Sequence, residues 1–218
     1  PAVLSEAQAV LRKYGLKKEI WINETNAPPS EDKQEPAWSA PRFRISLEEQ
    51  AAFVIQEFAI AFSAGATRVE FYKLRNTPDH PESIEPYGLL RGDDSRRPAF
   101  TAYQVSTAQL RDFRTATRER SGRVTAVTFD RGDRTTTVLW VDGMGSTRVR
   151  VRAIAAQALL LNERGETRTI RPVAGFYTVD LPGAQCLNRH CIIGGAPRLL
   201  VEAGSPGGRK ALTNTAAR

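Results

Sequence analysis

The carboxylate of Glu24 is the side chain in this sequence best placed to do chemistry. Residues 19–23, EIWIN, alternate apolar and polar positions and predict a short buried strand, which Pro28 and Pro29 prevent from continuing. In parallel α/β folds, ligand sites form at the carboxyl ends of strands and in the loops that follow them. From position alone two interpretations stay open for this carboxylate: a reactive group or a structural salt bridge.

Helical and extended segments alternate around this carboxylate. Residues 5–14 have helical periodicity and are followed by Gly15, which favours a helix end. Ser46 begins a capping box for a helix over residues 47–64, and residues 67–74 alternate as a second strand. A strand, helix and strand in this order predict a βαβ crossover and hence a parallel sheet.

Long polar loops follow both predicted strands, over residues 25–46 and 75–97. Loops of this length in a compact domain are commonly functional or disordered, and both are expected at the same end of the sheet as Glu24. Trp38 in the first loop is interpreted either as a platform for a sugar or other ring, or as a hydrophobic anchor. His80 in the second loop is either a surface residue or a ligand contact.

After a third predicted helix over residues 98–113, which begins with proline, the sequence changes to short alternating strands. Turn residues rich in glycine separate them at a spacing typical of a β-sandwich. The predicted strands are residues 123–129, 135–140, 147–153, 158–161, 167–170, 177–180 and 199–202.

These patterns predict an α/β part followed by an all-β part. We expect an α/β domain over residues 1–113 and an antiparallel β-sandwich over residues 122–204. Residues 114–121 are expected to form an arginine-rich linker, and residues 205–218 a disordered tail.

Composition limits the function classes. The formal net charge is +7, but the arginines are dispersed and no nucleic-acid-binding motif is recognisable, so we expect a solvated basic surface and no nucleic-acid partner. No apolar run approaches the roughly 20 residues that span a bilayer, which predicts no membrane span. The chain begins with Pro1 rather than methionine, which leads us to expect that it is cut from a longer polypeptide.

Two cysteines, Cys186 and Cys191, enclose four residues in the segment CLNRHC. They are interpreted as a disulfide, as free thiols, or as a metal site with His190. A disulfide would favour an oxidising compartment, extracellular or periplasmic. Tetrahedral zinc normally needs a fourth ligand, and the other histidine, His80, is distant in sequence. We therefore expect no metal and no cofactor.

Three motifs in the first half resemble the last quarter of a (β/α)8 barrel from retaining glycoside hydrolases of the largest barrel clan, which includes β-xylosidases, β-glucosidases, cellulases and mannanases. Strand seven of those enzymes ends in a phrase similar to W-I-T-E-T-[NG], here WINETN at residues 21–26. A Y-G-L-L-[RN]-x-D phrase matches residues 87–93, and R-P-A-[FY]-x-A-Y matches residues 97–103. The resemblance covers residues 1–113, and trailing β-sandwich domains also occur in the clan.

The resemblance implies a carbohydrate substrate and a role for each matching residue. Retaining glycosidases use two carboxylates, one as nucleophile and one as general acid and base. Glu24 would be the nucleophile, Tyr72 would stack on a sugar ring or hydrogen-bond the nucleophile, and the Asn26 amide would bind a hydroxyl. Trp38, His80 and Glu85 would be loop contacts to substrate, whereas Tyr87 and Tyr103 are expected in the core.

The sequence departs from the clan in its second carboxylate. The acid/base glutamate of these enzymes ends strand four in an N-E or N-E-P phrase, and no earlier strand exists here. Glu70 and Glu85 have the wrong context to replace it, and Tyr72 stands where many members carry tryptophan. We therefore expect a fragment that lacks strands one to six and its acid/base, with the missing N-terminal barrel portion as its partner. The alternative is a non-catalytic carbohydrate-binding or cell-surface interaction module.

Overall fold

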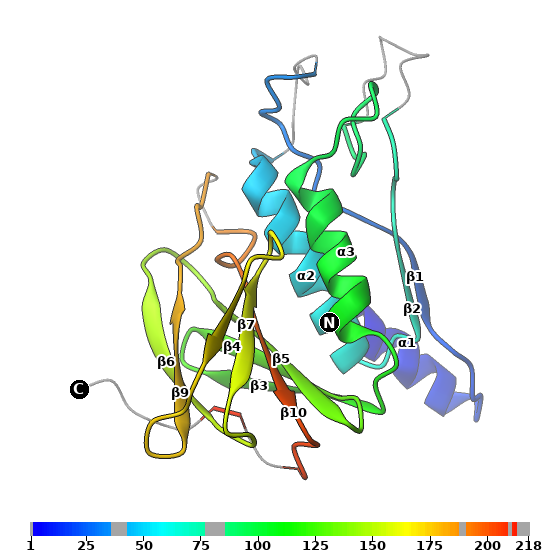
Figure 1. The fold of residues 1–218 in the computed structure, drawn as a ribbon. Coiled ribbons are helices and arrows are strands. Elements are labelled where there is room, and N and C mark those ends of the chain that lie inside the picture. Colours follow the sequence, from blue (N-terminus) through cyan, green and yellow to red (C-terminus); the bar gives the residue numbers. More distant parts are fainter. Residues whose placement is uncertain (1, 36–42, 77–85, 188–190, 209–210, 213–218) are drawn as a thin grey trace.

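The computed structural model describes residues 2–35, 43–76, 86–187, 191–208 and 211–212. In it, helices α2 and α3 lie between a small two-stranded sheet and a larger sheet (Figure 1). The elements of the first half are α1 (Ala2–Lys13), β1 (Trp21–Thr25), α2 (Leu47–Ser63), β2 (Arg68–Phe71) and α3 (Pro98–Leu110). Among the described residues, no helix is long and apolar enough to cross a bilayer.

The parallel βαβ unit predicted from the sequence is confirmed, because β1 pairs with β2 in parallel on either side of α2. The capping box is also confirmed. The Ser46 hydroxyl accepts a hydrogen bond from the Glu49 amide, and the Glu49 carboxylate accepts one from the Ser46 amide, which fixes where α2 begins. The start of α3 is favoured instead by proline at its first helical position.

All seven strands predicted in the second half are present within a residue or two. They are β4 (Val124–Asp130), β5 (Arg134–Val141), β6 (Thr147–Arg152), β7 (Ala158–Asn162), β8 (Thr167–Ile170), β9 (Phe176–Leu181) and β10 (Arg198–Ala203). Together with β3 (Thr115–Ser121) they form a six-stranded sheet of order β3-β4-β5-β10-β7-β8 and a two-stranded sheet, β6-β9. Every pairing among them is antiparallel.

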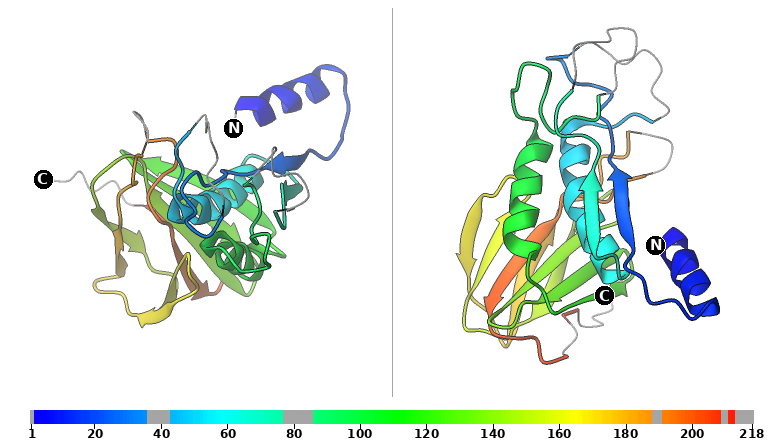
Figure 2. Two further views of the ribbon diagram at one scale, coloured as in Figure 1. Left: turned by 90° about the horizontal axis from the view of Figure 1, so that it is seen from above. Right: turned by 90° about the vertical axis from the view of Figure 1, so that its right-hand side faces the viewer.

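The six-stranded sheet is covered on both faces. One face packs against α2 and α3 through Phe129, Val138 and Trp140, and the other packs against the β6-β9 pair through Leu139 and Val141. Burial on both faces explains why β4 and β5 are buried along almost their whole length. Figure 2 shows this layering from two further directions, with α1 at the periphery away from the large sheet.

Two expectations about chain organisation are wrong. Residues 114–121 are not a linker, since residues 115–121 form the edge strand β3 in full register with β4. In the expected tail, the amides of Ala211 and Leu212 donate to the Glu119 carboxylate, and Leu212 forms a bridge with Val151. Part of the tail is therefore held against the sandwich, while residues 209–210 and 213–218 lie outside the described residues.

The predicted burial of the first strand is also wrong. β1 begins at Trp21, which is 51% exposed, and its residues are exposed or half-buried. The reason is that β2 is its sole strand neighbour among the described residues, so one edge and one face have no cover. Val10 and Tyr14 of α1 are likewise 55% and 66% exposed.

Candidate functional site

An open pocket of about 570 Å³ lies at the carboxyl ends of β1 and β2, lined by Glu24, Thr25, Asn26, Tyr72 and Tyr87. The parallel register brings these residues together, because Thr25 lies opposite Phe71 and the next residue along each strand enters the pocket. Glu24 is exposed there. The sequence-predicted residues Glu24, Asn26 and Tyr72 therefore share one site.

The Asn26 side chain ties the two strand-end loops together. Its amide nitrogen donates to the carbonyl of Tyr72 at 3.0 Å and to the carbonyl of Tyr87 at 2.6 Å. Its amide oxygen accepts from the amide of Ala27 at 2.8 Å and from the Gln50 side chain at 3.4 Å. Both amide hydrogens are thus engaged within the protein, so in this structure Asn26 positions the loops instead of offering donors to the pocket.

Two tyrosine rings form the aromatic part of the pocket. The Tyr72 and Tyr87 rings meet edge to face, with centroids 5.7 Å apart. Tyr72 is 37% exposed, and the peptide bond between it and Lys73 is cis. Tyr87 was expected in the core, yet it lines the pocket. Its position at the start of the YGLL phrase, residues 87–90, was the sequence signal that could have linked it to the site.

Tyr103, in contrast, packs where it was expected. Its ring contacts Phe58 and Phe71, with centroids 5.5 and 5.8 Å away, inside the core beneath the pocket. The other loop candidates, Trp38, His80 and Glu85, lie outside the described residues. Within the described ranges no cluster of histidine, cysteine, aspartate and glutamate is arranged to hold a metal ion.

A buried ion-pair network, which the sequence did not reveal, fixes the two loops behind the pocket. Asp32 accepts hydrogen bonds from Arg91 at 2.8 Å and from Arg97 at 2.9 Å. Glu35 accepts from Arg97 at 2.9 Å and from the Gly92 amide at 2.7 Å, and it also contacts the Asn76 side chain. Burial raises the pKa of Asp32, but the hydrogen bonds from the two arginines outweigh it and lower that pKa overall.

The same network holds the backbone on either side of Tyr87. Arg97 donates to the carbonyls of Pro86 at 2.7 Å and Gly88 at 2.8 Å, and Asn76 accepts from the Gly88 amide at 2.6 Å. A side chain at Gly88 would meet the Leu90 carbonyl at 2.3 Å, so glycine is required by close backbone approach. Tyr87 is therefore presented to the pocket by a rigidly bonded segment.

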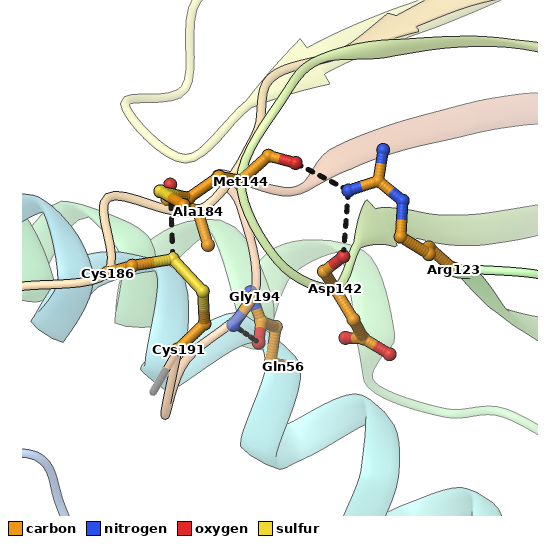
Figure 3. The surroundings of a disulfide bond; sticks show 8 residues. All are labelled: Gln56, Arg123, Asp142, Met144, Ala184, Cys186, Cys191 and Gly194. Carbon is orange, nitrogen blue, oxygen red and sulfur yellow. Dashed lines mark hydrogen bonds between the residues drawn. A yellow bond between two sulfur atoms is a disulfide. The ribbon is translucent and has the colours of Figure 1, made fainter. Parts of the chain in front are cut away.

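The disulfide-closed loop of the β part supports the loop after β1 from behind. Cys186 and Cys191 form a disulfide, which decides among the three interpretations left open by the sequence. Figure 3 shows that Gln56 of α2 lies beside this loop. Its side chain accepts from the Gly194 amide and donates to the Gly195 carbonyl. Ile193 then packs in one cluster with Ala27, the neighbour of Asn26.

The pocket combines one carboxylate with two tyrosine rings. A retaining glycosidase needs two carboxylates about 5 to 5.5 Å apart. Among the described residues that line the pocket, Glu24 is the single carboxylate. Tyrosine rings beside a carboxylate are suited to contact a sugar, because they offer apolar faces together with polar hydroxyl groups.

No protein-family model and no curated protein matches this sequence. Several solved structures share its fold. A family 39 glycoside hydrolase from the gut symbiont Bacteroides cellulosilyticus WH2 has a TM-score of 0.64 and 21% identity over 92% of this chain. A GH30 endoxylanase from Clostridium papyrosolvens C71 has a TM-score of 0.59 and 10% identity over 90%. A glucosidase from Croceicoccus marinus has a TM-score of 0.57 and 11% identity over 94%.

The chain spans 37%, 45% and 50% of the lengths of these three proteins. At such identities the likeness concerns the fold alone. The chain therefore has a glycoside hydrolase-like fold, as the sequence motifs predicted. It corresponds to at most about half of the length of each matched enzyme.

Proposed function

We propose that this chain is the C-terminal part of a retaining glycoside hydrolase, in which Glu24 is the catalytic nucleophile. Glu24 attacks the anomeric carbon and forms a glycosyl ester, which water hydrolyses in a second step. The observation that carries the proposal is the pocket at the carboxyl ends of two parallel strands, where one exposed carboxylate meets two tyrosine rings.

The surroundings of Glu24 suit this role. Asn26 bonds to the backbone of both Tyr72 and Tyr87, and the buried network around Arg97 holds the segment that carries Tyr87. A nucleophile and its sugar contacts must be held within a fraction of an ångström of the productive geometry. We assign Tyr72 and Tyr87 as sugar contacts and Asn26 as a positioning residue.

The acid/base carboxylate and the remaining barrel strands belong to a polypeptide segment outside these 218 residues in this proposal. The exposed surface of α1 and β1 supports it. Five apolar side chains of α1, β1 and the segment between them are between 49% and 77% exposed: Val3, Val10, Tyr14, Leu16 and Trp21. An apolar area of this kind is typical of a surface covered by another element.

The nucleophile is tested on the natural gene product that contains this segment. The reagents are 2-deoxy-2-fluoro glycosides with dinitrophenolate leaving groups, in xylosyl, glucosyl and galactosyl forms. The fluorine slows hydrolysis of the ester, and the good leaving group needs little protonation. Peptide mass spectrometry is expected to find one glycosyl group on Glu24. Labelling of another residue, or of none with any sugar, would contradict the assignment.

Turnover supplies the second test. Glu24→Gln is expected to lower hydrolysis of aryl glycosides by about a thousandfold or more, whereas the control Glu70→Gln, an exposed carboxylate on β2, should change it little. The 218-residue chain alone is expected to be inactive because it lacks the acid/base. Measurable turnover by this chain that Glu24→Gln abolishes would show that the partner carboxylate lies within it.

A further inference from the structure

The outer face of the two-stranded sheet β6-β9 is a row of arginines. Val149 and Val151 of β6 point into the sandwich core, so the alternate residues Arg148, Arg150 and Arg152 point outward and are exposed. Alternate side chains on one strand are about 7 Å apart. The row therefore presents three arginine side chains along one face of the strand pair.

The partner strand adds a single acidic residue to this face. In the antiparallel register, Arg148, Arg150 and Arg152 lie opposite Asp180, Thr178 and Phe176. Arg148 pairs with Asp180 at 2.6 Å. The hydrogen bond from Arg148 lowers the pKa of the Asp180 carboxyl, and the positive charge of Arg168 on β8 lowers it further. Arg148 and Arg168 thus both act on Asp180.

The remaining two arginines of the row are fixed without a carboxylate. The guanidinium groups of Arg150 and Arg152 lie 4.1 and 5.5 Å from the centroid of the Phe176 ring. Within the described part of the chain, neither makes an ion pair. Stacking on one ring orients the two guanidinium groups while leaving their N–H donors available to solvent.

We propose that the outer face of β6-β9 binds an extended, carboxylate-bearing polysaccharide. An arginine guanidinium donates two parallel hydrogen bonds to one carboxylate, and a row of arginines matches a chain with repeated anionic groups. A single-stranded nucleic acid would need open aromatic faces for its bases, whereas Phe176 is the one aromatic residue of this face and already carries guanidinium groups. The surface belongs to the β part, separate from Glu24, so the proposal does not depend on the nucleophile assignment.

Binding is tested on the whole chain with polygalacturonate as the anionic glycan. Neutral xylan and single-stranded DNA are the comparison ligands, and affinity is measured by calorimetry at two salt concentrations. The triple variant Arg148→Gln, Arg150→Gln and Arg152→Gln is expected to weaken polygalacturonate binding by about tenfold or more. Because these side chains are exposed, thermal unfolding should change little.

The matched control removes the same charge elsewhere. Arg111→Gln, Arg134→Gln and Arg164→Gln change arginines whose side chains are 71%, 48% and 57% exposed. This variant should bind within about twofold of the native chain. An equal loss in both triple variants, tighter binding of DNA than of polygalacturonate, or no polygalacturonate binding by the native chain would each overturn the proposal.

Discussion

Arg97 and Asp32 form an ion pair at 2.9 Å in which the side chains are 0% and 4% exposed. Arg97 precedes α3, and Asp32 lies in the loop that follows β1, so this contact joins the two strand-end loops that carry the candidate site. Replacing one partner of a buried pair leaves the other charge without compensation, which is more destabilising than removing both.

Asp32→Asn is therefore expected to lower the free energy of unfolding by about 3 kcal/mol, because Arg91 and Arg97 both lose their shared carboxylate. Denaturant unfolding at neutral pH measures the loss. The control is Glu31→Gln, whose partner is the exposed Arg44, and it should change stability by less than about 1 kcal/mol. Equal effects of the two substitutions would show that the buried network contributes no more than a surface pair.

The same carboxylate predicts a pH dependence. The pKa of Asp32 is lower in the folded chain than its ordinary value of 3.8. Its contribution is present above that value and is lost as the pH falls through the folded pKa. The stability difference between the native chain and Asp32→Asn should therefore shrink on acidification below about pH 4. A stability difference between the two proteins that stays constant down to pH 2 would show that Asp32 does not cause this pH dependence.

Asn26→Asp tests the positioning role at the pocket. The new carboxylate cannot donate to the carbonyls of Tyr72 and Tyr87, so we expect a stability loss of about 2 kcal/mol. In the natural gene product it should also slow glycosylation of Glu24. Asn23→Asp, at an exposed position on β1, the strand that ends just before Asn26, places the same charge nearby. If both substitutions act alike, the effect is one of charge and not of the two hydrogen bonds.

The sequence predicted the β part well because its signals are local. Short segments rich in β-branched residues, such as Val124–Asp130, with glycine turns between strands, are readable without knowing the partner strands. β3 was missed because TATRERS contains no large apolar residue. It is an edge strand that places Ala116 on the core, so propensity and burial give little sign of it.

The sequence predicted residues that the structure brings into one pocket, but not the contacts that hold that pocket in place. Glu24 follows a strand pattern and a motif, both readable from neighbours in the sequence. The partners of Asn26 are backbone carbonyls 46 and 61 residues away, which no local pattern indicates. The charges of Asp32 and Glu35 lie in a polar loop and read as solvated, yet folding buries them against Arg91 and Arg97.

The disulfide is expected to stabilise the support behind the loop after β1. Closing so short a loop contributes about 2 kcal/mol through the entropy of the unfolded chain. The double variant Cys186→Ser and Cys191→Ser should lose about that amount in denaturant unfolding. A reductant should bring the native chain to the same level and leave the double variant unchanged. A reductant effect on the double variant would show that the loss arises elsewhere.

Tyr177 predicts a separate change at alkaline pH. Its side chain is fully buried and its hydroxyl donates to the Ala155 carbonyl at 2.7 Å. Burial, with the nearby Glu202 carboxylate, raises its pKa from 10.0 to about 12. A raised folded pKa means that the contribution to stability is present below pH 10 and is lost as the pH rises toward about 12.

Tyr177→Phe removes this titration. At neutral pH it should lower stability by about 1 kcal/mol, the value of one lost hydrogen bond. Between pH 10 and 12 the native chain should lose about 2 to 3 kcal/mol more than the variant, so their stabilities converge and then cross. Tyrosinate absorbance should show one tyrosine fewer in the most alkaline phase. Tyr14→Phe, at a residue that is 66% exposed, is the control and should not alter that phase. If the native chain stays more stable than Tyr177→Phe throughout this range, Tyr177 ionises as an ordinary exposed phenol.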